Sequence, residues 1–261
     1  MRALRLWLYW ARLSLGREAL FRGNLLLRWL AHGLWLGTAW LFFEALYAHV
    51  PTLAGWRREH VWLLLAVNEG SQQLFNMFVG RSLAELPERI WEGQLDSVLT
   101  KPVSPLFILS IRRMQLHDAP ALGLPLVLGW IAWRALDISL TPERMFGFGL
   151  LILLGMVARY AVTLAAVSIG FWVSQLYALP ALMAVLFRLA SYPESIFRGA
   201  SRAIFTFVIP VLVVANFPVQ SLLTASFYEL LLRGLIAAGF WLFLAAQLWR
   251  AGLRRYTAVG G

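Results

Sequence analysis

The sequence predicts an all-α polytopic membrane protein with six transmembrane helices, and three observations lead to that prediction. Hydrophobic residues make up 60% of the 261 residues, and charged residues only 14%. The mean hydropathy of +0.69 is too high for a water-soluble domain. Apolar stretches close to the roughly 20 residues that a membrane-spanning helix needs lie at 24–47, 61–80, 117–136, 146–173, 176–197 and 227–249. Residues 1–261 are therefore expected to form a single transmembrane domain.

The first 23 residues predict an amphipathic helix that lies in the membrane interface. Arg2, Arg5 and Arg12 recur at helical spacing, and leucine and alanine residues follow the same period. The arginines at 12, 17 and 22 interrupt the apolar stretch that a cleavable signal peptide requires. We expect residues 1–23 to remain on the protein, with their arginines toward anionic headgroups.

The distribution of basic residues predicts that both termini face the cytoplasm. With six spans and a cytoplasmic N-terminus, the bias toward the inside is about two to one, as the positive-inside rule requires. The inner set is Arg2, Arg5, Arg12, Arg17, Arg22, Arg28, Arg81, Arg89, Lys101, Arg112, Arg113, Arg250, Arg254 and Arg255, and the outer set is Arg57, Arg58, Arg134, Arg144, Arg198 and Arg202. The net charge of +10 is explained by this bias, so no nucleic-acid partner is expected.

The composition also argues against catalysis and against metal binding. There is no cysteine, and the four histidines show no metal-ligand spacing. Motifs of nucleophilic or metal-dependent hydrolases are absent from the sequence. No catalytic residue, metal or cofactor is therefore expected on this chain.

The longest polar connection, residues 81–116, contains a helical segment with a mixed surface. Between Glu88 and Leu99, the apolar residues Ile90, Leu95, Val98 and Leu99 approximate one helical stripe. Pro102 and Pro105 are expected to end this helix. Glu85, Glu88 and Glu92, beside Arg89, have the pattern of a solvated charged face. The segment is either a loop resting on headgroups or a docking surface for a cytoplasmic partner.

The stretch IWEGQLDSVLTKPVSPLF in this connection resembles a motif of the permease subunits of bacterial ABC type-2 transporters. The motif Gly-x-Leu-Asp-x-x-Leu-x-(Lys/Arg)-Pro-(Val/Ile)-(Ser/Asn) is matched by Gly93, Leu95, Asp96, Leu99, Lys101, Pro102, Val103 and Ser104. Later similarities are Tyr192-Pro193-Glu194, then a Thr-Phe-x-x-Pro segment formed by Thr206-Phe207-Val208-Ile209-Pro210, and Asn216-Phe217-Pro218. The likeness covers nearly the whole chain, in the same order.

This resemblance implies an exporter subunit whose coupling helix, within 81–101, inserts into a separate ATPase. The residues implied in coupling are Glu88, Arg89, Trp91, Glu92, Gly93, Leu95, Asp96, Lys101 and Pro102. The only lysine, Lys101, does not lie in a phosphate-binding Gly-Lys loop, so ATP and Mg are expected on the partner. The implied assembly has two ATPase subunits and a second permease, identical or homologous, in the bacterial inner membrane. Lipids, polysaccharides, peptides and drugs all remain as substrate classes.

A polar stripe in the second span indicates either a transport path or a buried polar seam. Glu69, Gln72, Gln73 and Asn76 recur at helical spacing. An acid at membrane depth costs roughly 2.5–3.5 kcal/mol on insertion scales and requires a partner, for which Arg159 and Arg188 are the candidates. The alternative role for the stripe is to hold helices together.

Residues 198–226 are apolar but interrupted by Pro210 and Pro218, so a regular span is not expected there. We predict an outer re-entrant helical hairpin at 201–225. Two other function classes compete with the permease. One is an intramembrane enzyme acting through Glu69 and Arg159, and the other is a membrane scaffold without transport.

Overall fold

The computed structural model of this chain describes residues 22–139, 141–173, 176, 178–224 and 226–256. Within these residues the chain is helical and contains no strand, which confirms the all-α prediction. The predicted interfacial helix at 1–23 lies almost entirely outside the described residues.

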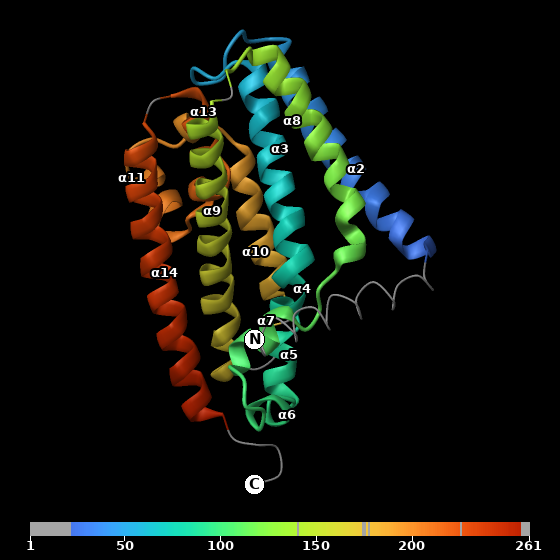
Figure 1. The fold of residues 1–261 in the computed structure, drawn as a ribbon, viewed down its shortest axis with the longest axis vertical. Coiled ribbons are helices and arrows are strands. Elements are labelled where there is room, and N and C mark those ends of the chain that lie inside the picture. The colour runs from blue at the N-terminus through green and yellow to red at the C-terminus, as the bar shows by residue number, and fades with distance from the viewer. Residues whose placement is uncertain (1–21, 140, 174–175, 177, 225, 257–261) are drawn as a thin grey trace.

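The long helices lie side by side, with α2 leaning away from the others toward one end (Figure 1). They are α2 (Arg22–Tyr47), α3 (Arg58–Phe75), α8 (Gly123–Leu136) preceded by η2 (Leu116–Leu122), α9 (Pro142–Ser168) continued by η3 (Ile169–Phe171), α10 (Leu179–Arg188) continued by η4 (Leu189–Ser191), and α14 (Phe227–Arg255). Three stretches of the described chain are long and apolar enough to cross a membrane: Leu116–Leu136, Pro142–Phe171 and Phe227–Arg255. The count of six spans stays a prediction.

The ends of α8 and α9 follow from local sequence. Asp137, directly after α8, adopts a left-handed conformation with φ of +50°, which turns the chain. The hydroxyl of Thr141 accepts a hydrogen bond from the backbone N–H of Arg144, and Pro142 occupies the first helical position. A short connection therefore joins α8 to α9 and keeps them antiparallel.

The polar connection after α3 forms a chain of short helices at the lower end of Figure 1. They are the π-helix η1 (Asn76–Gly80), α4 (Arg81–Ala84), α5 (Leu86–Trp91), α6 (Asp96–Leu99) and α7 (Pro105–Ile111). The prediction of one helix from 88 to 99 is wrong, because Gly93 has a φ of +71° and breaks the segment between α5 and α6. The backbone N–H groups of Gly93 and Gln94 donate to the carbonyls of Ile90 and Arg89, at 3.3 and 3.0 Å. This pair of bonds is the glycine-dependent end of an α-helix.

Residues 194–223 form further short helices near the opposite end of the bundle (Figure 1). They are η5 (Glu194–Ile196), α11 (Ala200–Ala203), the π-helix η6 (Ile204–Val208), α12 (Val211–Val214) and α13 (Asn216–Leu223). All four residues of α12 are buried. A Cβ on Gly155 of α9 would lie 2.8 Å from the carbonyl oxygen of Val213, so glycine permits this close approach. The predicted re-entrant hairpin is compatible with this arrangement and stays a prediction.

Asn216 ties this broken segment to the chain that follows α10. Its side chain is fully buried. Its Oδ1 accepts from the backbone N–H of Glu194 at 2.8 Å, and its Nδ2 donates to the carbonyls of Ala190 and Tyr192 at 3.2 and 3.1 Å. One buried amide thus forms hydrogen bonds with three backbone groups, and the two of them that belong to the buried residues Ala190 and Glu194 would otherwise carry a desolvation cost.

Candidate functional site

The apolar face of the short helices α4 to α6 is buried against the membrane helices. Leu83, Leu86, Ile90, Leu95 and Val98 are all buried. They share one cluster with side chains of α9 and α14, namely Leu164, Ala165, Val167, Ala245 and Trp249. Burial of such side chains stabilises a fold by roughly 1.5–3 kcal/mol each. These helices are therefore fixed to the ends of α9 and α14, and the interpretation as a loop resting on headgroups does not explain their packing.

The opposite face of the same segment is exposed and forms what we call the tip. The tip comprises the exposed side chains Glu88, Trp91, Glu92, Gln94, Ser97, Leu99, Thr100, Lys101 and Pro102. Trp91 is 53% exposed and Leu99 is 39% exposed, although Leu99 was expected on the apolar stripe. Exposed tryptophan is enriched at protein-binding surfaces and their binding hot spots.

The predicted coupling residues divide between the tip and its support. Five of them belong to the tip: Glu88, Trp91, Glu92, Lys101 and Pro102. Leu95 is buried, while Arg89, Gly93 and Asp96 are half-buried. These four residues shape and hold the surface.

Glu85 is a hub of ion pairs, in contrast to the solvated role expected from the sequence. Its Oε2 accepts from Arg89 Nη2 at 2.8 Å and from Arg113 Nε at 3.1 Å. Arg113 also donates its backbone N–H to Ser82 Oγ at 2.8 Å. Glu85 thereby joins α5 to the chain that follows α7. No local pattern in the sequence indicates this link, because Arg89 and Arg113 are separated by 24 positions.

The end of α14 reaches the same region through Tyr256. The Tyr256 ring packs edge-on against Phe171 with centroids 6.3 Å apart, and Phe171 packs similarly on Trp249 at 5.4 Å. Burial, together with the neighbouring Asp96 carboxylate, raises the pKa of Tyr256. Asp96 therefore lies between the tip and the last membrane helix.

The polar stripe of α3 is turned inward, as the sequence predicts. Glu69 and Gln73 are buried, and Gln72 and Asn76 are half-buried. Gln73 Nε2 donates to Glu69 Oε1 at 3.0 Å, and Gln72 Nε2 donates to Asn76 Oδ1 at 3.2 Å. These four residues and Arg159 of α9 form what we call the seam.

Arg159 is the most deeply buried charged residue of the described chain, with 2% exposure. Its Nη2 donates to Gln72 Oε1. Its guanidinium lies 4.5 Å from the ring centroid of Phe187 and 5.0 Å from that of Phe75, a geometry that stabilises a cation by cation–π attraction. Its Nε and Nη1 have no hydrogen-bond partner among the described residues. An incompletely paired charge at membrane depth is typical of a functional site.

Among the described residues Glu69 forms no salt bridge within 4 Å with Arg159 or Arg188, so the predicted pairing at up to about 6 Å stays a prediction. Glu69 Oε1 instead lies 3.6 Å from Nδ1 of His32 on α2. Arg188 is exposed, and its guanidinium stacks 3.9 Å above the ring centroid of Trp35. From the sequence, His32 was considered only as a metal ligand, although it is the only titratable residue between Arg28 and Glu44. A search for every titratable group in the first span would have found it.

The described residues contain no group of three or more His, Asp or Glu side chains arranged to hold a metal ion. The seam offers amide, carboxylate and guanidinium groups, which suit recognition of a polar molecule by hydrogen bonds. It lacks an activated nucleophile beside a general base, the arrangement that covalent catalysis requires.

Residues 34–260 match the model of a family described as ABC-2 family transporter protein. No curated protein and no solved structure matches the chain.

Proposed function

Because the chain belongs to the ABC-2 family of transporter proteins, we propose that it is the permease subunit of an ATP-binding-cassette exporter. Permeases of this family work with ATPase subunits. The proposed complex contains two ATPase subunits, which hold ATP and Mg, and a second permease that is identical or homologous. Each permease supplies half of the path. The chain then crosses the bacterial inner membrane six times, with both termini in the cytoplasm.

The tip is the observation that carries the proposed coupling role. It presents Trp91 and Leu99 to the outside, while the other face of the same short helices is packed into α9 and α14. A surface held in this way moves as a rigid body with the helices to which it is fixed. Docking of an ATPase on the tip would therefore displace α9 and α14.

The seam supports a role in the path, and it is connected to the tip. Phe75 stacks on Arg159 and also belongs to the apolar cluster that holds Ile90, Leu95 and Val98. A displacement of the tip would therefore reach the guanidinium through one aromatic ring. The incompletely paired Arg159 is then available to a polar group of the substrate when the helices move.

Reversal of charge on the tip tests this function. We expect Glu92→Lys to lower both binding of the co-purified ATPase subunit and ATP hydrolysis by the reconstituted complex. Trp91→Ala is expected to weaken binding by at least about 2 kcal/mol, the usual cost of truncating a central interface tryptophan. Asp96→Lys also disturbs Tyr256, so Tyr256→Phe is its companion variant.

Glu143→Lys is the matched control, because Glu143 is also exposed but lies at the start of α9, at the other end of the bundle. It should leave binding and hydrolysis unchanged. If Glu92→Lys, Asp96→Lys and Trp91→Ala all bind and stimulate the ATPase like the unmodified chain, the tip is not the coupling surface. A chain that purifies active without any ATPase would instead favour an enzyme.

A further inference from the structure

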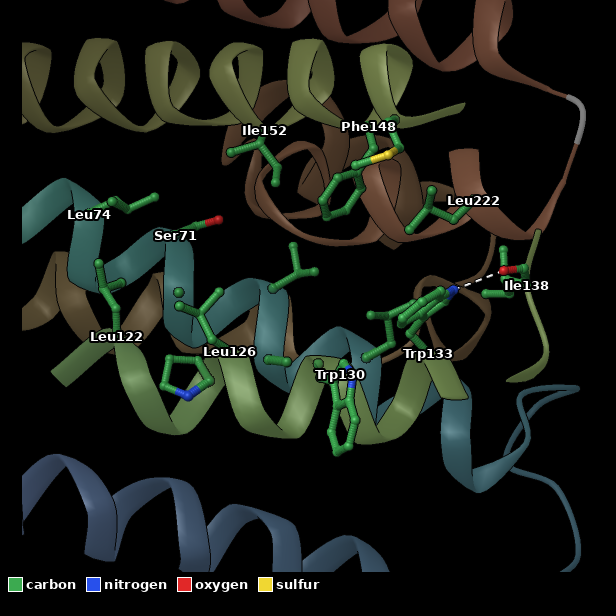
Figure 2. Close-up of a pocket in the computed structure, with 17 residues that line it drawn as sticks. Ser71, Leu74, Leu122, Leu126, Trp130, Trp133, Ile138, Phe148, Ile152 and Leu222 are labelled. Carbon is green, nitrogen blue, oxygen red and sulfur yellow. Dashed lines mark hydrogen bonds between the residues drawn. The ribbon is translucent and has the colours of Figure 1, made fainter. Parts of the chain in front are cut away.

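An elongated apolar cavity lies between α3, α8 and α9, on a different side of α3 from the seam. Its volume is about 510 Å3. Figure 2 shows Leu74 and Leu122 toward one end and Trp133 and Ile138 toward the other, with Ile152 of α9 across from α8. We call this cavity the slot.

The lining of the slot is almost entirely apolar. Among the described residues that line it, Ser71 is the only one with a hydroxyl, amide or charged side chain. The indole N–H of Trp133 already donates to the carbonyl of Ile138 at 2.8 Å. Water needs two to four polar partners in a buried site, so water is not a suitable occupant.

The length and volume of the slot match one lipid chain. The lining residues of α3 run from Leu63 to Leu74, and eleven residues at about 1.5 Å each span about 16 Å. That is close to half of the roughly 30 Å hydrocarbon core, which is one leaflet. Since a water-sized group such as a methylene occupies roughly 30 Å3, the volume is sufficient for one alkyl chain.

The end of the slot near Trp133 offers a cation where a lipid phosphate would lie. Arg134 is exposed, and its guanidinium lies 5.0 Å from the ring centroid of Trp130, which lines the slot. No ion pair of Arg134 is formed within the described chain, although Asp137 follows α8 directly and Glu143 lies in the first turn of α9. Tryptophan and arginine together are typical of the membrane–water interface.

The slot is separate from the seam. At about 100° per residue, the α3 residues that line the slot and the polar stripe of α3 point about 140° apart. The slot therefore faces α8 and the first half of α9, whereas Glu69 points toward His32 of α2 and Gln72 toward Arg159, farther along α9. We propose that the slot binds one acyl chain of a bilayer phospholipid from the leaflet opposite the tip, with its phosphate at Arg134. This phospholipid is a bound component of the membrane and not the transported molecule.

Photolabelling tests the proposal. The full chain is reconstituted, without ATPase, in vesicles that contain phosphatidylglycerol with a diazirine at the middle of one acyl chain, and labelled residues are mapped by mass spectrometry. We expect the lining residues of α3 and α8 to be labelled more strongly than the lipid-exposed face of α14. Gly70→Leu should lower slot labelling about tenfold, because the added side chain overpacks the space.

Leu126→Trp fills the same slot from its rim and serves as the second filling variant. The matched control is Gly239→Leu on α14, where a Cβ meets no atom within 4 Å, and it should leave slot labelling unchanged. Arg134→Gln should lower labelling about two- to fivefold, as expected for loss of an exposed ion pair. Thermal midpoints of all variants establish that they are folded.

Three results would overturn the proposal: equal labelling of the slot and of α14, unchanged labelling in both filling variants, or protein–protein cross-links through the slot, which would show that a second copy occupies it. Because no ATPase is present, none of these results bears on the coupling role of the tip.

Discussion

Replacement of Gly93 tests whether coupling depends on the shape of the tip. Gly93 has a φ of +71°, and the hydrogen bonds from Gly93 and Gln94 to Ile90 and Arg89 end α5 at this residue. The chain then turns so that Leu95 is buried and Trp91 is exposed. A side chain at this position must either be held in the left-handed region or release the turn.

The expected magnitude follows from this geometry. A residue with a Cβ in the left-handed region costs roughly 1–2 kcal/mol, and asparagine tolerates it better than most. Gly93→Ala therefore shifts the equilibrium between the native and a rearranged turn by about tenfold, since 1.4 kcal/mol is a factor of ten. Gly93→Pro cannot adopt a positive φ and must also give up both hydrogen bonds, each worth about 0.5–1.5 kcal/mol. The loss of coupling is therefore expected to be smallest for Gly93→Asn, larger for Gly93→Ala and largest for Gly93→Pro.

The assay is ATP hydrolysis by the reconstituted complex, together with the affinity of the ATPase subunit for the permease. Coupling should fall in the order given. The thermal midpoint of the isolated permease should fall in the same order, by an amount that corresponds to these few kcal/mol, and coupling is compared among variants that remain folded. Unchanged coupling in the Ala and Pro variants would refute the argument. An Asn variant as defective as the Pro variant would show that a side chain of any kind is excluded, for example by close contact with the partner.

Three further predictions concern the membrane part. Arg159→Met should leave the thermal midpoint unchanged or raise it, since replacing a buried charge by an apolar group is often neutral or stabilising by about 1–4 kcal/mol. The same variant should abolish transport. Retained transport would assign the seam to helix packing. Gly155→Val should destabilise by about 1–3 kcal/mol because its Cβ meets the Val213 carbonyl, whereas Gly149→Val, which meets nothing within 4 Å, should not; equal midpoints would contradict this. Asn216→Ala should cost about 1–3 kcal/mol per unsatisfied group and speed amide exchange after α10; unchanged exchange would argue against the tie.

The sequence was sufficient to predict elements whose signal is local. The stretches 116–136, 142–171 and 227–255 are long apolar helices because hydropathy over some twenty residues decides that outcome. The end of α6 before Pro102, and the inward face of the α3 stripe, also follow from nearby residues. The family resemblance, which rested on the motif around Gly93, is confirmed by the family match.

Features that depend on long-range contacts could not be predicted in the same way. Glu69 has His32 as its neighbour because α2 packs on α3, and nothing in the sequence gives that pairing. The break at Gly93 was missed because a helical stripe of period 3.6 was extended through a glycine. Glycine adopts the helical and the left-handed backbone conformation with similar ease. At Gly93 the choice between these two conformations depends on the burial of Leu95 and Val98 against α9 and α14.

The π-helix η1 gives the proposed coupling a structural route. It joins the seam, which ends at Asn76, to α4 and α5 without a loop. π-helical turns are uncommon and are frequent at functional sites, because they add one residue to a turn and shift the register of the faces on either side. In this chain the seam residues Gln72 and Asn76 precede or begin η1, whereas Leu83 and Leu86, which follow it, face the buried apolar cluster that supports the tip. In the proposed coupling, a lengthwise movement of α5 would reach the seam through α4 and η1, and Phe75 would carry the same movement sideways to Arg159.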